Sequence, residues 1–195
     1  MQNPREASLE KARTTLIYGE KSEHPDCILL MGLPGTGKSY VSRYLYKNHG
    51  YTVLSGENIT YALFGDTKCQ PSEYKEAYNV LYMFAQELLS EGYKIVIDGT
   101  NLQYVHRKQT YDIFGSKTNI FGIHLITTDS LSMERIGQRG EKNDNTTHIL
   151  SQCSPETFLS FKESLELPME HENIYTIQSD EDIYENIDKL LISLN

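Results

Sequence analysis

Eight consecutive residues of this chain have the types and spacing of a phosphate-binding loop: Gly32-Leu33-Pro34-Gly35-Thr36-Gly37-Lys38-Ser39. They match the pattern G-x-x-x-x-G-K-[S/T] at every position. In such a loop the glycines let successive backbone N–H groups point at phosphate oxygens, the lysine reaches the terminal phosphates, and the serine hydroxyl ligates Mg²⁺. The motif therefore predicts a nucleoside triphosphate site, with ATP and Mg²⁺ as its ligands.

The sequence on either side of this loop has the character that the motif requires. Cys27 to Met31 is a short apolar run typical of a buried parallel strand, and Val41 to Tyr46 can continue a helix. This context disfavours the alternative, a chance match in an ordinary glycine-containing turn. The residues expected to contact the nucleotide are Gly32, Pro34, Gly35, Thr36, Gly37, Lys38, Ser39 and Tyr40, with Lys38 also catalytic and Ser39 a metal ligand.

A second chemical feature is a carboxylate at the end of an apolar strand, Lys94 to Asp98. An aspartate at the carboxyl end of a parallel strand beside a phosphate loop can bind Mg²⁺ directly or through water. The alternative is a turn residue, since Asp-Gly is a favourable turn pair. Beside the phosphate loop, Asp98 is interpreted as a metal ligand and a catalytic residue.

The residues after Asp98 resemble one group of enzymes, the P-loop kinases related to the kinase domain of polynucleotide kinase. Asp98-Gly99-Thr100-Asn101 and the later Arg107 resemble the strand-end signature of that group, and Arg135-Ile136-Gly137-Gln138-Arg139 resembles its R-x-x-x-R lid motif. The resemblance covers roughly residues 26 to 180, and the group that it indicates includes AAA-type kinases. It implies that Thr100, Asn101 and Arg107 face the phosphoryl acceptor.

The two lid arginines have a physical rationale of their own. Residues four apart lie on one face of a helix, so Arg135 and Arg139 can both bind the phosphate oxygens and neutralise the charge that moves during transfer. Lys142 could assist them from a lid expected near Ser130 to Asn145. The alternative is a solvated basic face. Both arginines are interpreted as catalytic and nucleotide-binding.

The general base is where the chain departs from the resemblance. The related kinases have an acid-x-x-Arg motif after the second strand, and here Glu57 stands for the usual Asp and Thr60 for the usual Arg. Both are expected on the acceptor side, and either Glu57 or Asp98 takes the acceptor proton. Glu57 could instead be a first-turn acid favoured by the helix dipole. The missing arginine argues against a phosphorylated acceptor, including a nucleic-acid end.

Composition limits the remaining possibilities. The chain has 195 residues, 38% of them hydrophobic, with a net charge of −9, and no apolar run is long enough to cross a membrane. No secretory signal is recognised, so a soluble, cytoplasmic protein is expected. The acidic charge favours a small-molecule acceptor or a single nucleic-acid end over a long polymer. Cys27, Cys69 and Cys153 are odd in number and widely spaced, and reduced thiols are expected.

The chain alternates short apolar runs with amphipathic segments, a pattern that predicts an α/β fold. The fold class expected is the P-loop NTPase three-layer sandwich, with a mostly parallel five-stranded sheet and helices on both faces. Residues 26–195 form the predicted kinase domain, and residues 1–25 an N-terminal extension. The predicted strands are Cys27 to Met31, Thr52 to Ser55, Lys94 to Asp98, Ile120 to Thr127 and Ile174 to Ile177. The predicted helices include Ala7 to Leu16, Ser72 to Glu91, a segment capped by Ser154, and Asp182 to Leu194 after a possible cap at Ser179.

Together these features predict an ATP-dependent kinase that transfers the γ-phosphoryl group to a hydroxyl of a small molecule or a nucleic-acid 5′ end. Two alternatives remain: a simple ATPase, and a nucleotide-binding regulatory module that has lost catalysis. A fold and a phosphate loop do not decide among them. The oligomeric state is left open.

Overall fold

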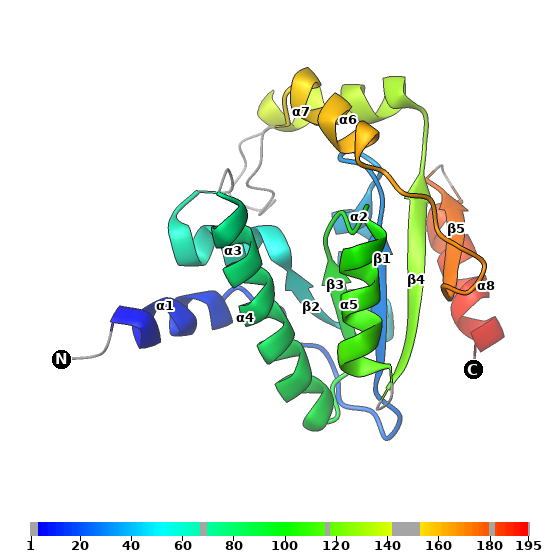
Figure 1. Ribbon diagram of the computed structural model, residues 1–195. Coiled ribbons are helices and arrows are strands. Elements are labelled where there is room, and N and C mark those ends of the chain that lie inside the picture. Colours follow the sequence, from blue (N-terminus) through cyan, green and yellow to red (C-terminus); the bar gives the residue numbers. More distant parts are fainter. Residues whose placement is uncertain (1–3, 67–69, 116–117, 142–152, 180–181, 195) are drawn as a thin grey trace.

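The computed structural model describes residues 4–66, 70–115, 118–141, 153–179 and 182–194, which form one α/β body (Figure 1). Its centre is a parallel five-stranded sheet with the order β2-β3-β1-β4-β5. The strands are β1 (Asp26–Met31), β2 (Thr52–Ser55), β3 (Ile95–Asp98), β4 (Asn119–Ile126) and β5 (Ile174–Gln178). The predicted fold class is confirmed, and each strand lies within one residue of its predicted bounds.

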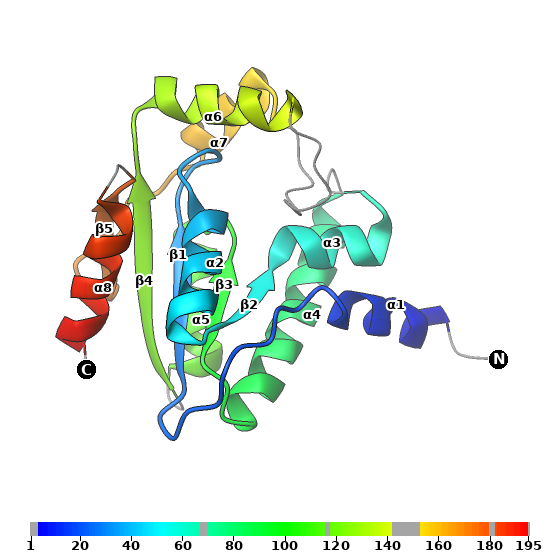
Figure 2. The ribbon, with the colours of Figure 1, turned by 180° about the vertical axis from the view of Figure 1, so that it is seen from behind.

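Helices cover both faces of the sheet, as Figures 1 and 2 show from opposite sides. They are α1 (Pro4–Arg13), α2 (Lys38–His49), α3 (Gly56–Phe64), α4 (Pro71–Ser90), α5 (Tyr104–Phe114), α6 (Asp129–Glu141), α7 (Pro155–Glu163) and α8 (Ile183–Leu194). Successive side chains of β1 point to opposite faces of the sheet, so each face has its own hydrophobic core. Cys27 and Leu29 face α1, α3, α4 and α5, whereas Ile28 and Leu30 face α2 and α8.

Helix α1 and the residues just after it pack against helices α3 and α4. α1 contacts α3, and Ala12 and Leu16 are buried in the core that α3 and α4 share. The Arg13 guanidinium makes a two-pronged ion pair with Glu87 of α4, at 2.7 and 2.8 Å. Residues 4–16 are therefore held against the helical layer on that side of the sheet.

Helix α4 shows where the sequence pattern and the structure differ. Tyr74, Leu81 and Leu88 share the apolar face that helical spacing gives this segment, but Tyr74 is 42% exposed. The buried side chains of α4 begin at Ala77, because the first turn of the helix lies outside the core cluster. Tyr78 is half-buried, and its contacts are described below.

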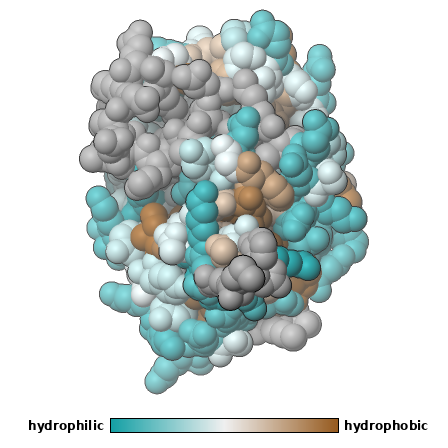
Figure 3. Space-filling model, turned by 90° about the vertical axis from the view of Figure 1, so that its left-hand side faces the viewer, coloured by the Kyte–Doolittle hydropathy of each residue, from teal (hydrophilic) through white to brown (hydrophobic). Residues whose placement is uncertain are grey.

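The face that carries α1 and α4 is mostly hydrophilic, with separate hydrophobic spots (Figure 3). No helix of the described residues is both long and apolar enough to span a membrane. Cys27 is buried and Cys153 half-buried, these two form no disulfide, and Cys69 lies outside the described residues.

Candidate phosphoryl-transfer site

The phosphate-binding loop joins β1 to α2 at the carboxyl edge of the sheet. Gly32, Gly35 and Gly37 have φ angles of 145°, 84° and 94°, a region that other residues rarely adopt. Gly37 caps α2, so the first N–H groups of that helix open into the loop. The Lys38 ammonium donates to the carbonyl oxygens of Gly32 and Leu33, both at 2.8 Å. The lysine therefore lies inside the loop that its motif predicts it to serve.

Helix α6 rests directly on this loop, above the ends of the strands in Figure 1. A Cβ atom added to Gly35 would lie 2.4 Å from the carbonyl oxygen of Ser132, so the two backbones are in contact. One turn further along α6, the Arg135 guanidinium donates to Ser179 Oγ at 3.0 Å and to the Ser179 carbonyl at 3.1 Å. It also reaches the Gly35 carbonyl at 3.4 Å. Arg135 thus lies across the loop, tied to the end of β5.

The remaining lid residues are described in part. Arg139 lies four positions after Arg135 in α6, so its backbone places it on the same helical face, but its side chain is outside the described residues. Lys142 and the predicted lid beyond Glu141 also lie outside them.

The predicted metal ligands come together beside the loop. Asp98 is only 8% exposed, and its Oδ2 accepts a hydrogen bond of 3.0 Å from the Ser42 hydroxyl. Burial raises the pKa of Asp98, while Lys38 and hydrogen bonds from Ser42 and Ser39 oppose that rise. A carboxylate and a serine hydroxyl side by side are hard oxygen ligands of the kind that Mg²⁺ prefers. Ser39 and Asp98 therefore fit the ion by the chemistry of their oxygen atoms.

The two candidate bases lie on neighbouring strand ends. Ser55, the last residue of β2, pairs in register with Asp98, the last residue of β3. Ser55 then caps α3 by accepting the Asn58 N–H, which places Glu57 in the first helical turn. Glu57 is half-buried. The structure therefore brings Glu57 and Asp98 to one edge of the sheet.

Two residues expected on the acceptor side have internal partners. The Thr60 hydroxyl is buried and donates to the Gly56 carbonyl at 2.7 Å. The Asn101 amide is buried and donates to the Leu30 carbonyl at 2.7 Å, with a φ of 46°. Asn101 therefore ties the loop after β3 to the end of β1. Of the predicted Thr100-Asn101 pair, Thr100 is the half-buried member, and its carbonyl accepts the Gly32 N–H at 3.0 Å.

The position of Arg107 corrects an expectation. Its side chain is fully buried in α5, where Nε and Nη2 donate to the Glu172 carboxylate at 2.7 and 2.9 Å. Its Nη1 donates to the carbonyl oxygens of Leu102, Glu166 and Asn101. A guanidinium with all these donors engaged and no exposed surface has no group left for an acceptor. Arg107 instead holds the loop after β3 against the segment before β5.

Four further residues of the site are not predicted from the sequence: Ser42, Tyr78, Ser132 and Ser179. Only Ser42 carries a sequence signal, because it follows Lys38 by one helical turn and so shares its face of α2. Ser179 was expected to cap the last helix, but its side chain and carbonyl accept hydrogen bonds from Arg135.

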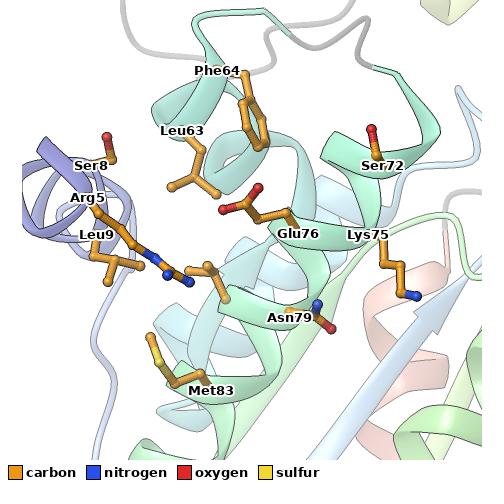
Figure 4. Close-up of a pocket in the computed structure, with 11 residues that line it drawn as sticks. Arg5, Ser8, Leu9, Leu63, Phe64, Ser72, Lys75, Glu76, Asn79 and Met83 are labelled. Carbon is orange, nitrogen blue, oxygen red and sulfur yellow. The ribbon is translucent and has the colours of Figure 1, made fainter.

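A separate cavity of about 800 Å³ lies between α1, α3 and α4 (Figure 4). Apolar and charged side chains line it together, among them Leu9, Leu63, Phe64, Lys75 and Glu76. None of the phosphate-loop residues lines it, so it is distinct from the site described above.

The fold and the loop together define a P-loop protein with a kinase-like site. The family model AAA_33, described as an AAA domain, matches residues 27–168. The chain belongs to this family, and its resemblance to P-loop kinases is confirmed. Comparison with curated protein sequences finds no significant match.

Solved structures share the fold at low identity. Chaetomium thermophilum Kti12 in complex with ADP-AlF3 aligns with a TM-score of 0.66 and 17% identity, over 87% of this chain and 99% of that chain. Mycobacterium tuberculosis APS kinase CysC, in complex with AMPPNP and APS, aligns with a TM-score of 0.63 and 18% identity, over 89% and 99%. A gluconokinase from Sinorhizobium meliloti 1021 aligns with a TM-score of 0.60 and 18% identity, over 89% and 93%. At these identities the likeness shows the fold alone.

Proposed function

We propose that this protein is an ATP-dependent phosphotransferase that phosphorylates a hydroxyl group of a small molecule. The observation that carries the proposal is the convergence of Lys38, Asp98 and Arg135 on one phosphate loop. A cation inside the loop, a carboxylate beside Ser39 and a cation across the loop are the groups that phosphoryl transfer needs. Residues 26–195 form the kinase domain in this proposal, and residues 1–25 are an extension, of which residues 4–16 pack against the helical layer.

The roles of the residues follow from their positions. The loop N–H groups and Lys38 bind the β- and γ-phosphates, and Arg135 neutralises charge as the γ-phosphoryl group moves. Ser39 and Asp98 would hold Mg²⁺, which supplies charge neutralisation between the phosphates. The acceptor oxygen forms a bond to the γ-phosphorus, and the bond to the β–γ bridging oxygen breaks, so that ADP leaves.

The proton of the acceptor hydroxyl needs a base, and Glu57 fits this role better than Asp98. Asp98 already accepts hydrogen bonds from the Ser42 and Ser39 hydroxyls, so it is committed to the side of the phosphate loop. Glu57 stands in the first turn of the neighbouring helix, at the same edge of the sheet. We therefore assign proton removal to Glu57.

The acceptor side favours a small hydroxyl compound over a nucleic-acid end. Arg107 is buried against Glu172, and Thr60 stands where related kinases have an arginine, so neither supplies a cation for an acceptor phosphate. The solved neighbours include a gluconokinase and an APS kinase, which supports a kinase with a small acceptor.

The test is transfer of labelled γ-phosphate from ATP to gluconate, glucose, adenosine and a 5′-hydroxyl oligonucleotide. We expect the wild-type protein to label a small acceptor and Lys38→Ala to lose that transfer. Equal transfer by Lys38→Ala would refute the proposal. ATP binding with neither transfer nor hydrolysis would favour the second candidate, a nucleotide-binding regulatory module. The substitution of Thr60 for arginine supports that candidate.

A further inference from the structure

The phenol of Tyr78 reaches from α4 into the corner where β2 and β3 end. A Cβ atom added to Gly99 would lie 2.8 Å from the Tyr78 hydroxyl oxygen, and one added to Gly56 would lie 3.2 Å from it. Gly56 follows β2 and Gly99 follows β3, and the last residues of these strands pair in register. The hydroxyl therefore lies between two glycines at the carboxyl edge of the sheet.

Gly56 and Gly99 are glycines because a side chain there would crowd the Tyr78 phenol, and not because the backbone needs an unusual conformation. Neither Gly56 nor Gly99 has the positive φ that other residues avoid, whereas Gly32, Gly35 and Gly37 all have it. A contact under 3.0 Å at Gly99 means that any side chain there would displace the phenol. The chain thus leaves room for the Tyr78 hydroxyl beside Asp98, the residue before Gly99.

Within the described part of the chain, no hydrogen bond joins the Tyr78 hydroxyl to another residue. One turn further along α4, the Tyr82 hydroxyl pairs with the Thr110 hydroxyl at 3.2 Å. The two tyrosines of this helix therefore differ. The Tyr82 hydroxyl is hydrogen-bonded inside the core, whereas the Tyr78 hydroxyl lies at the ends of β2 and β3.

The Tyr78 phenol carries its proton at neutral pH, because phenols ionise only in alkaline solution. A neutral phenol beside a carboxylate donates a hydrogen bond and does not become a base. The group is thus suited to hold an oxygen atom of a bound molecule near Asp98.

We propose that the Tyr78 hydroxyl donates a hydrogen bond to an oxygen atom of the phosphoryl acceptor. This inference rests on the proposed function and narrows the acceptor class to compounds with a second oxygen near the phosphorylated hydroxyl, such as sugars, sugar acids and nucleosides. Tyr78 and Glu57 then contact the acceptor from α4 and α3, on the side of the sheet opposite α2.

The test compares Tyr78→Phe with a matched control, Tyr82→Phe, in the full-length protein. Each substitution removes one hydroxyl from the same helix, but only Tyr78 points at the site. Using the best acceptor among gluconate, glucose, adenosine and a 5′-hydroxyl oligonucleotide, we expect Tyr78→Phe to raise the acceptor KM about fivefold to tenfold. The Kd for ATP should stay that of the wild type. Tyr82→Phe should leave both constants unchanged.

A second variant, Gly99→Ala, displaces the phenol without removing it and should raise the acceptor KM in the same direction. An unchanged acceptor KM in Tyr78→Phe, with the wild-type protein active, would overturn this inference alone. Failure of the wild-type protein to transfer phosphate to every acceptor would overturn it together with the proposed function. A rise in KM for ATP instead of the acceptor would also overturn it, because Tyr78 would then act on the loop.

Discussion

The Ser42 hydroxyl donates a hydrogen bond of 3.0 Å to Asp98, and Ser42 stands one helical turn after Lys38. Helix α2 therefore does two things: it places the lysine in the phosphate loop, and it fixes the carboxylate at the end of β3. Burial disfavours the ionised form of Asp98, while Lys38 and the two serines favour it. The carboxylate is held in position by the same helix whose N-terminus opens into the phosphate loop.

Replacement of Asp98 by Asn tests its role at the metal. The amide keeps the size of the side chain and removes its charge, so we expect Asp98→Asn to lower the affinity for MgATP by about tenfold or more. The affinity for ATP in the presence of a chelator should not change. Binding is measured by calorimetry under both conditions. Asp188→Asn, on α8 and paired with Tyr44, is the control, and an equal loss in that variant would contradict the assignment.

Replacement of Arg107 by Ala tests its structural role. The change leaves the buried Glu172 carboxylate without its partner, and we expect the free energy of unfolding to fall by about 3–5 kcal/mol. Lys108→Ala breaks the exposed ion pair with Asp112 on the same helix and should cost far less stability, because solvent screens that pair. Urea unfolding measures both. Equal stability of the two variants would show that the buried pair is not holding the loop.

The fold follows from the sequence because its central strands are buried on both faces. Such strands appear as short apolar runs, and β1 and β3 were found from Cys27 to Met31 and Lys94 to Asp98 for that reason. The convergence of Lys38 and Asp98 follows as well, since the carboxyl ends of parallel strands meet at one edge of the sheet. Local sequence patterns and this rule about strand ends are therefore enough to predict that Lys38 and Asp98 lie close together.

The surroundings of the residues expected on the acceptor side could not be predicted, because they depend on contacts between residues far apart in the sequence. Helix α5 was not predicted, since Arg107 and Thr110 take the buried positions that apolar residues usually take. The resemblance implies that Arg107 faces the acceptor, and no local pattern reveals that its partner is Glu172, 65 positions away. Nothing local indicates that Asn101 bonds Leu30, or that Tyr78 ends between Gly56 and Gly99.

Acid should destabilise the protein through His124, which is buried on β4. Burial, Arg107 and Lys38 lower the pKa of His124 to about 4, whereas an unfolded histidine titrates at 6.5. Between these values the unfolded chain binds a proton that the folded protein excludes, so stability falls as pH falls. The free energy of unfolding should drop by about 2 kcal/mol from this residue between about pH 7 and about pH 5.

The His124→Gln variant tests this source of the pH dependence. We expect its free energy of unfolding to change less with pH than that of the wild type, because the titrating group is gone. His106→Gln, at an exposed position of α5, serves as the control and should keep the wild-type slope. Chemical unfolding at a series of pH values gives the comparison. A wild-type slope in His124→Gln would assign the acid sensitivity to other groups.

Alanine substitutions at Gly35 and Gly65 distinguish two effects: strain in the left-handed backbone, and contact of the new methyl group with neighbouring atoms. Gly35 has a φ of 84° and Gly65 a φ of 78°, but a Cβ at Gly35 would lie 2.4 Å from the Ser132 carbonyl, and none of the described atoms lies within 4 Å at Gly65. Both alanine variants should lose about 1–2 kcal/mol of stability from the left-handed conformation. Only Gly35→Ala should lose ATP binding, because its methyl group must push α6 off the loop that binds the phosphates. Thermal unfolding and nucleotide titration of the two variants measure these effects, and normal ATP binding by Gly35→Ala would show that the loop tolerates displacement of α6.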